Sequence, residues 1–306
     1  MNETVAVARY EQAASLLPQK WERIALHLED YRKAMAEELR LRVGQPMTVL
    51  LPEGEILLDG GRERVEQSEL EQLVDQVTEY SRYAAATMAQ GFITAQGGFR
   101  VGLGGTAVIE QGRCISLCDI SSACIRIARE NTGVSNDLID KIAPGGMPES
   151  TLVIAPPGVG KTTVLRDMIR NLSNGTERIP PQRVSIADER QELAAVFHGK
   201  PQLDIGSHTD VLSGCPKAEG MMMLLRCANP QIIAVDEITA REDVKAMETV
   251  SRCGVKLLAT VHGADVEDIR EKPLFSGLLS LKIFTYCIVI SRNKDGKRRY
   301  RVERLC

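Results

Sequence analysis

Hydrophobic positions at the start of the chain follow a helical period. Between residues 8 and 40, apolar side chains recur at spacings of three and four, with charged residues between them. The repeating positions are Ile24, Leu28, Tyr31, Met35 and Leu39. This pattern predicts one long amphipathic helix, with Pro18 marking the first turn of its main part.

The pattern then becomes mixed. Apolar and polar residues alternate over 39–51 and 54–61, which predicts two strands, and over 97–117, which predicts a hairpin. A helix is predicted over 68–93, because Ser68 followed by Glu71 is typical of a capping box. Together these elements indicate an α+β domain over about 38–130.

Apolar runs alternate with helical segments in the second half of the chain. Predicted strands cover 151–155, 183–188, 231–237, 256–262 and 284–291, and a turn at Asp295 and Gly296 leads into 298–305. Such runs are typical of a parallel sheet buried on both faces. The turn-rich stretch 132–150 places a boundary near residue 145. We therefore expect an N-terminal helical and α+β domain, 1–145, followed by an α/β domain, 146–306.

A candidate phosphate-binding loop joins the first of these strands to a helix. The segment APPGVGKT, from Ala155 to Thr162, fits GxxxxGK[ST] except at its first position. Glycines let backbone N–H groups point inward at phosphate oxygens, and the helix adds the positive end of its dipole. The expected nucleotide-binding residues are Pro157, Gly158, Val159, Gly160, Lys161, Thr162 and Thr163.

Ala155 is the departure from the motif, because glycine is usual at that position. A methyl group is tolerated there only if the residue keeps a negative φ. Pro156 and Pro157 have no N–H, so the donors must come from residues 158–163.

A second acidic element supports nucleotide hydrolysis. Asp236 and Glu237 end a buried strand, and the carboxyl ends of parallel strands meet at one edge of the sheet. We expect Mg²⁺ to be held by Thr162 and Asp236, with Asp188 as a further ligand. Glu237 is expected to orient and deprotonate the attacking water. Two acids that cap a turn are the structural alternative.

Further polar residues follow the other strands. Glu189 and Glu192 come after 183–188, where catalysis or simple enrichment of acids at a helix start both fit. His262 ends 256–262 and is a candidate γ-phosphate sensor or a structural histidine. Arg226 is a candidate for the cation that stabilises transition-state charge from a neighbouring subunit, with Arg100 and Arg190 as other candidates.

Composition narrows the classes of function. A net charge of −3 gives no overall attraction to nucleic acid, although 292–304 carries seven basic and two acidic residues. We expect a solvated hairpin there, with a binding patch as the alternative. No leader peptide and no spanning segment are evident, so a cytoplasmic protein without direct membrane insertion is expected. The 8 cysteines form no CxxC pair.

Four segments together resemble one known family. They are APPGVGKTTVLRD, VSIADERQELAA, LSGCPKAEGMMMLLRCANPQIIAVDEI and ATVHGAD. They resemble the stage III sporulation protein AA family of endospore-forming bacteria, which is similar to the traffic ATPases of type II and type IV secretion. The N-terminal segments ELRLRVGQP and GFITAQGGFRVGLGGTA extend the resemblance over nearly the whole chain.

The resemblance implies a RecA-like P-loop ATPase domain preceded by an α+β domain, with ATP and Mg²⁺ as cofactors. It also implies a hexameric ring that docks on membrane proteins and energises a channel between mother cell and forespore. By resemblance, Asp188, Glu189 and Glu192 stand at the family's acidic box and His262 at its histidine box. Ala155 departs from the family's loop, and Asp236 stands where many secretion ATPases have glycine.

Three functions remain open on sequence. The first is an ATP-hydrolysing motor of a secretion-like complex. The second is an ATPase stimulated by nucleic acid, against which the negative charge and the few aromatic residues weigh. The third is a binding protein that holds nucleotide as a structural ligand only, which applies if Ala155 weakens the loop.

Overall fold

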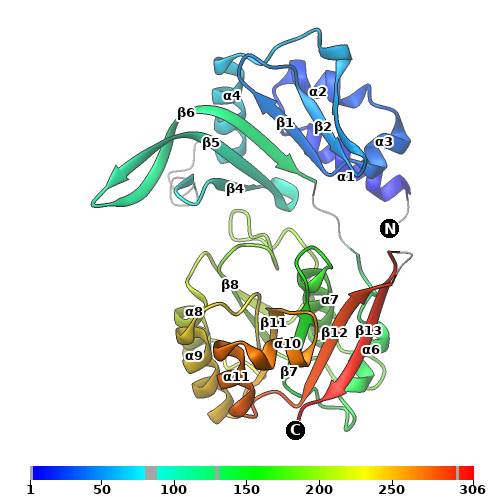
Figure 1. Cartoon of the computed structure of the whole chain (residues 1–306), viewed down its shortest axis with the longest axis vertical. Coiled ribbons are helices and arrows are strands. Elements are labelled where there is room, and N and C mark those ends of the chain that lie inside the picture. Colours follow the sequence, from blue (N-terminus) through cyan, green and yellow to red (C-terminus); the bar gives the residue numbers. More distant parts are fainter. Residues whose placement is uncertain (1–2, 80–87, 128–130, 294–295) are drawn as a thin grey trace. The chain divides into compact units, whose positions relative to one another are not determined.

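The chain folds into two compact units in a computed structural model that describes residues 3–79, 88–127, 131–293 and 296–306 (Figure 1). The first unit comprises Met1–Glu130 together with Ala195–Gln202, and the second comprises Asn131–Ala194 and Leu203–Cys306. The expected boundary near residue 145 lies inside the second unit, because the helix α6 (Asn136–Ile142) packs on the helix that follows the phosphate loop.

Three helices replace the single helix predicted at the start. They are α1 (Glu3–Ala14), α2 (Gln19–Leu26) and α3 (Asp30–Met35). Pro18 is the N-cap of α2 and interrupts the helix before it, because proline has no N–H to continue the ladder. The predicted apolar stripe is interrupted as well, because the helix ends after Leu26 and again after Met35: Tyr31 is 52% exposed, and Leu39 lies in a strand.

The first unit contains a sheet of six strands in the order β3-β2-β1-β6-β5-β4. The strands are β1 (Glu38–Arg42), β2 (Thr48–Leu51), β3 (Gly54–Leu57), β4 (Phe92–Ala95), β5 (Phe99–Glu110) and β6 (Arg113–Arg126), and all neighbours are antiparallel. The hairpin predicted at 97–117 is confirmed. Gln111 and Gly112 both have positive φ at its turn, as a two-residue hairpin turn requires.

One helix of the first unit is shorter than predicted. The N-cap of the helix α4 (Gln67–Thr78) is Glu66, two residues before the predicted cap, and the Glu66 N–H donates to Glu69 at 2.8 Å. Its predicted end at Ile93 is wrong, because that residue lies in β4. Residues 80–87 of the prediction lie outside the described residues.

The second unit is built on a sheet of seven strands in the order β13-β12-β7-β11-β10-β8-β9. The strands are β7 (Thr151–Ala155), β8 (Val184–Asp188), β9 (Thr209–Ser213), β10 (Ile232–Val235), β11 (Lys256–His262), β12 (Tyr286–Arg292) and β13 (Arg298–Arg304). All pairs are parallel except β12 with β13. The predicted strands are present, and the half-exposed edge strand β9 was missed because its alternation is weak.

Helices cover both faces of this sheet. One face carries Ile154, Ile233 and Leu257, which form a single buried cluster with side chains of the helices on that side. Those helices are α8 (Lys217–Cys227), α9 (Arg241–Arg252), α10 (Val266–Glu271) and α11 (Pro273–Ser280). The helix α7 (Lys161–Asn174) contacts β7, β8 and β11 but adds nothing to that cluster, so it covers the other face.

A buried carboxylate ties α6 to α7. Asp167 of α7 is 3% exposed and accepts hydrogen bonds from the Gly133 N–H at 2.9 Å and the Ser135 N–H at 2.7 Å. Arg170 also donates to it, at 2.8 Å. Burial raises the pKa of Asp167, but these donors outweigh burial and hold the pKa below its usual value.

We predict that Asp167→Asn lowers the free energy of unfolding by about 2–3 kcal/mol, because an amide cannot accept from all these donors. The native pKa lies below that of the unfolded chain, so the carboxylate stabilises the fold at neutral pH and its contribution is lost as the pH falls below about 4. Denaturant unfolding at pH 7 and at acid pH measures both effects. Asp140→Asn, which removes an exposed ion pair with Arg178, is the control and should change little.

Candidate functional site

The loop between β7 and α7 has the backbone that a phosphate cradle needs. Gly158 has φ 71° and Gly160 has φ 107°, values that side-chain-bearing residues rarely adopt. Ala155 is absent from the residues with positive φ and pairs with His262 of β11 as an ordinary strand residue. Its methyl group is therefore tolerated, and the departure from the motif does not strain the loop.

Lys161 opens α7 with all of its donors engaged. Its ammonium donates to the Ala155 carbonyl at 3.0 Å, to the Pro156 carbonyl at 3.2 Å and to Nδ1 of His262 at 2.7 Å. The residue is only 6% exposed. Burial lowers the pKa of Lys161, and the negative charges of Asp236 and Glu237 oppose that effect. The ammonium is thus fixed at the loop through contacts that a phosphate oxygen could replace.

His262 connects this lysine to Glu237. An ammonium can only donate, so Nδ1 of His262 accepts from Lys161 and the ring proton is on Nε2. Nε2 lies 3.1 Å from Oε1 of Glu237 and donates to it. The expected histidine and glutamate therefore meet at the loop, at the carboxyl ends of β11 and β10.

Asp236 lies between two hydroxyl groups. Thr162 donates to its Oδ2 at 2.6 Å, and Thr260 donates to its Oδ1 at 2.5 Å. Thr260 is fully buried and also accepts from the Glu237 N–H at 2.8 Å. Sequence reasoning did not assign a role to Thr260. The available signal was one hydroxyl residue inside the apolar strand β11.

Glu237 has a left-handed backbone, with φ 53°. Such a conformation is costly for a glutamate and is held here by the Thr260 bond to its N–H. Its Oε2 forms an ion pair with Arg190, and the side chain is 22% exposed. The turn after β10 thus directs the carboxylate toward His262 on one side and Arg190 on the other.

Two expected acids have other contacts. The Asp188 carboxylate is buried and accepts from the N–H groups of Glu192, Leu193 and Ala194 at 2.9, 3.2 and 2.9 Å. Burial raises its pKa, and these donors oppose the rise. Asp188 therefore orders the turn after β8, and its expected metal contact stays a prediction.

The contact observed for Glu189 is with a residue outside the loop. Glu189 forms an ion pair of 2.5 Å with Lys217, a 5% exposed residue at the start of α8. Its catalytic assignment stays a prediction, and the observed contact joins the turn after β8 to α8.

Arg226 is also distant from the loop of its own chain. It is an exposed residue in the last turn of α8, three residues before Asn229. The Asn229 carbonyl accepts a hydrogen bond from Arg183, the residue just before β8 begins. That is the amino-terminal edge of the parallel strands, opposite the phosphate loop. Arg100 belongs to the first unit, where its guanidinium stacks on Phe92 at 3.7 Å. A role for either residue in a neighbouring subunit stays a prediction.

The pair formed by Thr162 and Asp236 fits a magnesium ion. Mg²⁺ prefers oxygen ligands and usually takes one or two from protein, with phosphate and water completing its shell. A hydroxyl and a carboxylate oxygen 2.6 Å apart at the start of α7 meet that requirement. Within the described part of the chain, no three or more His, Cys, Asp or Glu residues come together as a metal site. A magnesium ion held by Thr162 and Asp236 would therefore need phosphate and water as its other ligands.

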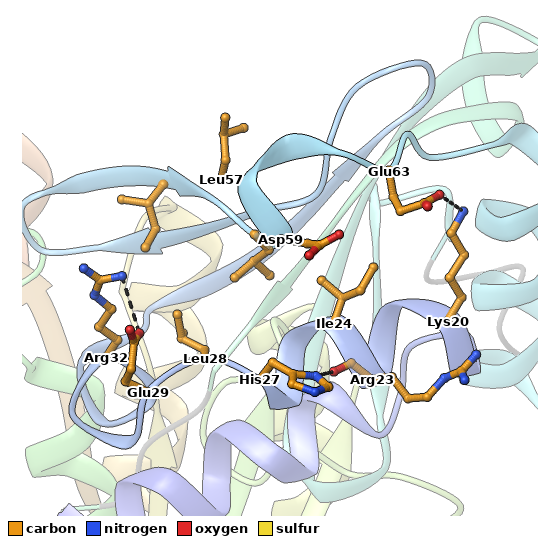
Figure 2. Close-up of a pocket in the computed structure, with 12 residues that line it drawn as sticks. Lys20, Arg23, Ile24, His27, Leu28, Glu29, Arg32, Leu57, Asp59 and Glu63 are labelled. Atoms are coloured by element: carbon orange, nitrogen blue, oxygen red, sulfur yellow. Dashed lines mark hydrogen bonds and ion pairs between the residues drawn. The ribbon is translucent and has the colours of Figure 1, made fainter.

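A separate cavity of about 680 Å³ lies in the first unit (Figure 2). Its walls come from α2, the turn before α3, α3 itself through Arg32, and β3 with the segment that follows it. Lys20 pairs with Glu63 at 3.2 Å, and Arg32 pairs with Glu29 at 3.4 Å, so these charges at the cavity are already neutralised (Figure 2). The cavity carries none of the expected chemistry.

The fold and the loop define a class of protein. The second unit is a RecA-like P-loop domain, and the solved structures of an ATPase and of a pilus retraction motor share the fold. The chain superposes on the Legionella pneumophila ATPase DotB with a TM-score of 0.57 and 17% identity, covering 99% of this chain and 80% of that one. The pilus retraction motor PilT with bound ADP gives a TM-score of 0.60 and 17% identity, covering 88% and 78%.

Sequence comparison shows the family to which the chain belongs. The model of the family described as "Sporulation stage III, protein AA" matches residues 7–302. The stage III sporulation protein AA of Bacillus subtilis (strain 168) is 33% identical over 284 residues, which is 92% of this chain and 91% of that protein. The chain therefore belongs to the stage III sporulation protein AA family, as the sequence motifs predicted.

We predict that Thr260→Val weakens both the fold and the site. The substitution keeps the shape but leaves the Glu237 N–H without its acceptor and one Asp236 oxygen without its donor. The expected loss in free energy of unfolding is about 1–3 kcal/mol, measured by denaturant unfolding. Thr249→Val on the exposed face of α9 is the matched control, and an equal loss in both variants would contradict the role of Thr260.

Proposed function

We propose that the protein is a magnesium-dependent ATPase that drives a secretion-like complex during sporulation. The observation that supports this most directly is the meeting of Lys161, His262 and Glu237 at the phosphate loop, with Asp236 bonded to Thr162 beside them. A purely structural nucleotide site needs the loop and the lysine. It does not need a carboxylate held in a strained backbone beside a histidine.

In this proposal the loop and its lysine bind the triphosphate. The N–H groups of residues 158–163 and the dipole of α7 face the phosphates, and Lys161 supplies a charge that is already in position. A bound γ-phosphate takes over one of the three ammonium contacts. The other two partners are carbonyls of the loop itself, so we expect His262 to be released from Lys161 when ATP binds.

Thr162 and Asp236 hold the magnesium ion in this proposal. The ion neutralises phosphate charge as it develops during transfer. The chain's own contribution is to keep both oxygens at the start of α7, with Thr260 fixing the second oxygen of Asp236.

Glu237 is the proposed general base. Its carboxylate accepts from His262 and Arg190, so two donors fix its orientation before water arrives. In this proposal, His262 turns away from Glu237 once the γ-phosphate has displaced it from Lys161, which frees one carboxylate oxygen for the attacking water. His262 would thereby report the occupancy of the loop to the base, which is the sensor role expected from the sequence.

The assembly is also part of the proposal. We propose a homo-oligomeric, hexameric ring in the cytoplasm of the mother cell, docked on membrane proteins and energising a channel to the forespore. Support comes from family membership and from a fold shared with an ATPase and a pilus retraction motor. No helix in the described residues combines the length and apolar character needed to span a bilayer.

Stimulation by nucleic acid is a weaker alternative. The basic C-terminal stretch is its main support, but Arg292 and Arg301 of that stretch already contact the loop carbonyl of Gly158 and the carboxylate of Glu303. An ATPase assay with and without DNA or RNA separates the two functions, since only this alternative predicts a stimulation that salt abolishes.

Lys161→Ala is expected to abolish ATP hydrolysis and to weaken Mg-ATP binding at least tenfold, because the charge nearest the phosphates is lost. Calorimetric titration of the purified chain and a phosphate-release assay measure the two effects. Lys245→Ala, on the exposed surface of α9, is the control. Normal turnover in the Lys161 variant would refute the site.

Glu237→Gln is expected to retain ATP binding and to lose turnover by a factor of about 10²–10⁴, the range for removal of a general base. The amide still accepts a hydrogen bond from His262 but cannot take a proton from water. Binding and hydrolysis are measured on the same sample, with Glu242→Gln at an exposed position as the control. Equal turnover in both variants would exclude Glu237 as the base.

A further inference from the structure

The C-terminal hairpin brings two arginines to the phosphate loop. The strand β12 runs parallel to β7, so its carboxyl end lies at the same edge of the sheet as the loop. Arg292 is its last residue, and Arg298 is the first residue of the antiparallel strand β13. The two arginines are direct cross-strand partners.

Each arginine reaches the loop in a different way. Arg292 donates to the Gly158 carbonyl at 3.1 Å and so fastens the hairpin to the loop. The guanidinium of Arg298 lies against Gly160, where a Cβ would be 2.9 Å from Nη2 and 3.0 Å from Cζ. The φ of 107° favours glycine at residue 160, and the absence of a side chain there lets the Arg298 guanidinium lie directly against the loop.

Within the described residues, no carboxylate compensates the charge of this pair. Like charges directly opposite on two strands destabilise a hairpin. Among the residues that the structure describes, neither Arg292 nor Arg298 forms an ion pair with a carboxylate. In the same residues, the Arg298 guanidinium donates no hydrogen bond. Two other arginines of β13 do have partners: Arg301 pairs with Glu303, and Arg304 donates to the Cys306 carbonyl. An anion at the loop would remove the repulsion.

We propose that Arg298 binds the phosphate chain of the nucleotide from within the same subunit, with Arg292 positioning the hairpin that carries it. The ligand class is a nucleoside di- or triphosphate. This inference rests on the proposed function, and it adds a cation that the loop motif does not contain. Lys161 and Arg298 are distinct contributions, because Lys161 points to the carbonyls of residues 155 and 156, whereas Arg298 lies over Gly160.

The test compares Arg298→Ala with Arg299→Ala in the full chain. Arg299 is the adjacent exposed arginine, and its cross-strand partner is Ser291. Calorimetric titration with Mg-ATP and Mg-ADP is expected to show affinity about tenfold weaker in the Arg298 variant, within the range for a hydrogen bond between charged groups. Arg299→Ala should bind as the unmodified chain does. Arg298→Gln keeps a long polar side chain but removes the charge, and it should also bind nucleotide more weakly. This second variant replaces the alanine variant in the comparison if Arg298→Ala does not fold.

The outcomes separate this inference from the proposed function. If the unmodified chain binds nucleotide and both Arg298 variants bind it equally well, Arg298 has no part in binding and only this inference fails. If Arg298→Ala and Arg299→Ala lose affinity equally, the effect is general surface charge, which also overturns it. If the unmodified chain binds no nucleotide, the proposed function fails and this inference fails with it.

Discussion

The bonds around the Lys161 ammonium are the contacts on which the site depends. Two backbone carbonyls of the loop and one ring nitrogen of His262 hold a buried charge at the junction of β7 and α7. A buried ammonium without such partners would cost several kcal/mol. The loop must therefore fold around its lysine, and β11 must end beside it. The register of β7 against β11 pairs Ala155 with His262, which places the histidine between Lys161 and Glu237.

Much of this site could be predicted because the chemistry depends on local spacing. The glycines, lysine and threonine of the loop are adjacent in sequence, so their backbone geometry follows from residue type. Asp236 and Glu237 could be placed because parallel strands bring their carboxyl ends together. The residue pattern also predicted the α+β class of the first unit, although it predicted one helix in place of three and extended α4 into β4.

What the sequence could not show are contacts between distant segments. The acids after β8 looked equivalent in sequence, yet Asp188 binds three backbone N–H groups and Glu189 binds Lys217. The choice depends on how a turn closes on itself, which residue type does not encode. The basic stretch likewise looked like a solvated hairpin, because nothing in its composition reveals that Arg292 ends at the Gly158 carbonyl.

The division of the chain has a practical consequence. Eight residues from the second half, Ala195–Gln202, belong to the first unit, so the polypeptide passes between the units after residues 130, 194 and 202. A fragment ending at Glu130 would lack the Gln202 side chain that accepts from the Gly97 N–H. Because the first unit includes residues 195–202, cutting the chain at a single position cannot give both units complete. The turn that Asp188 orders immediately precedes one of these passages, so the chain leaves the second unit directly from a segment whose backbone is fixed by a buried carboxylate.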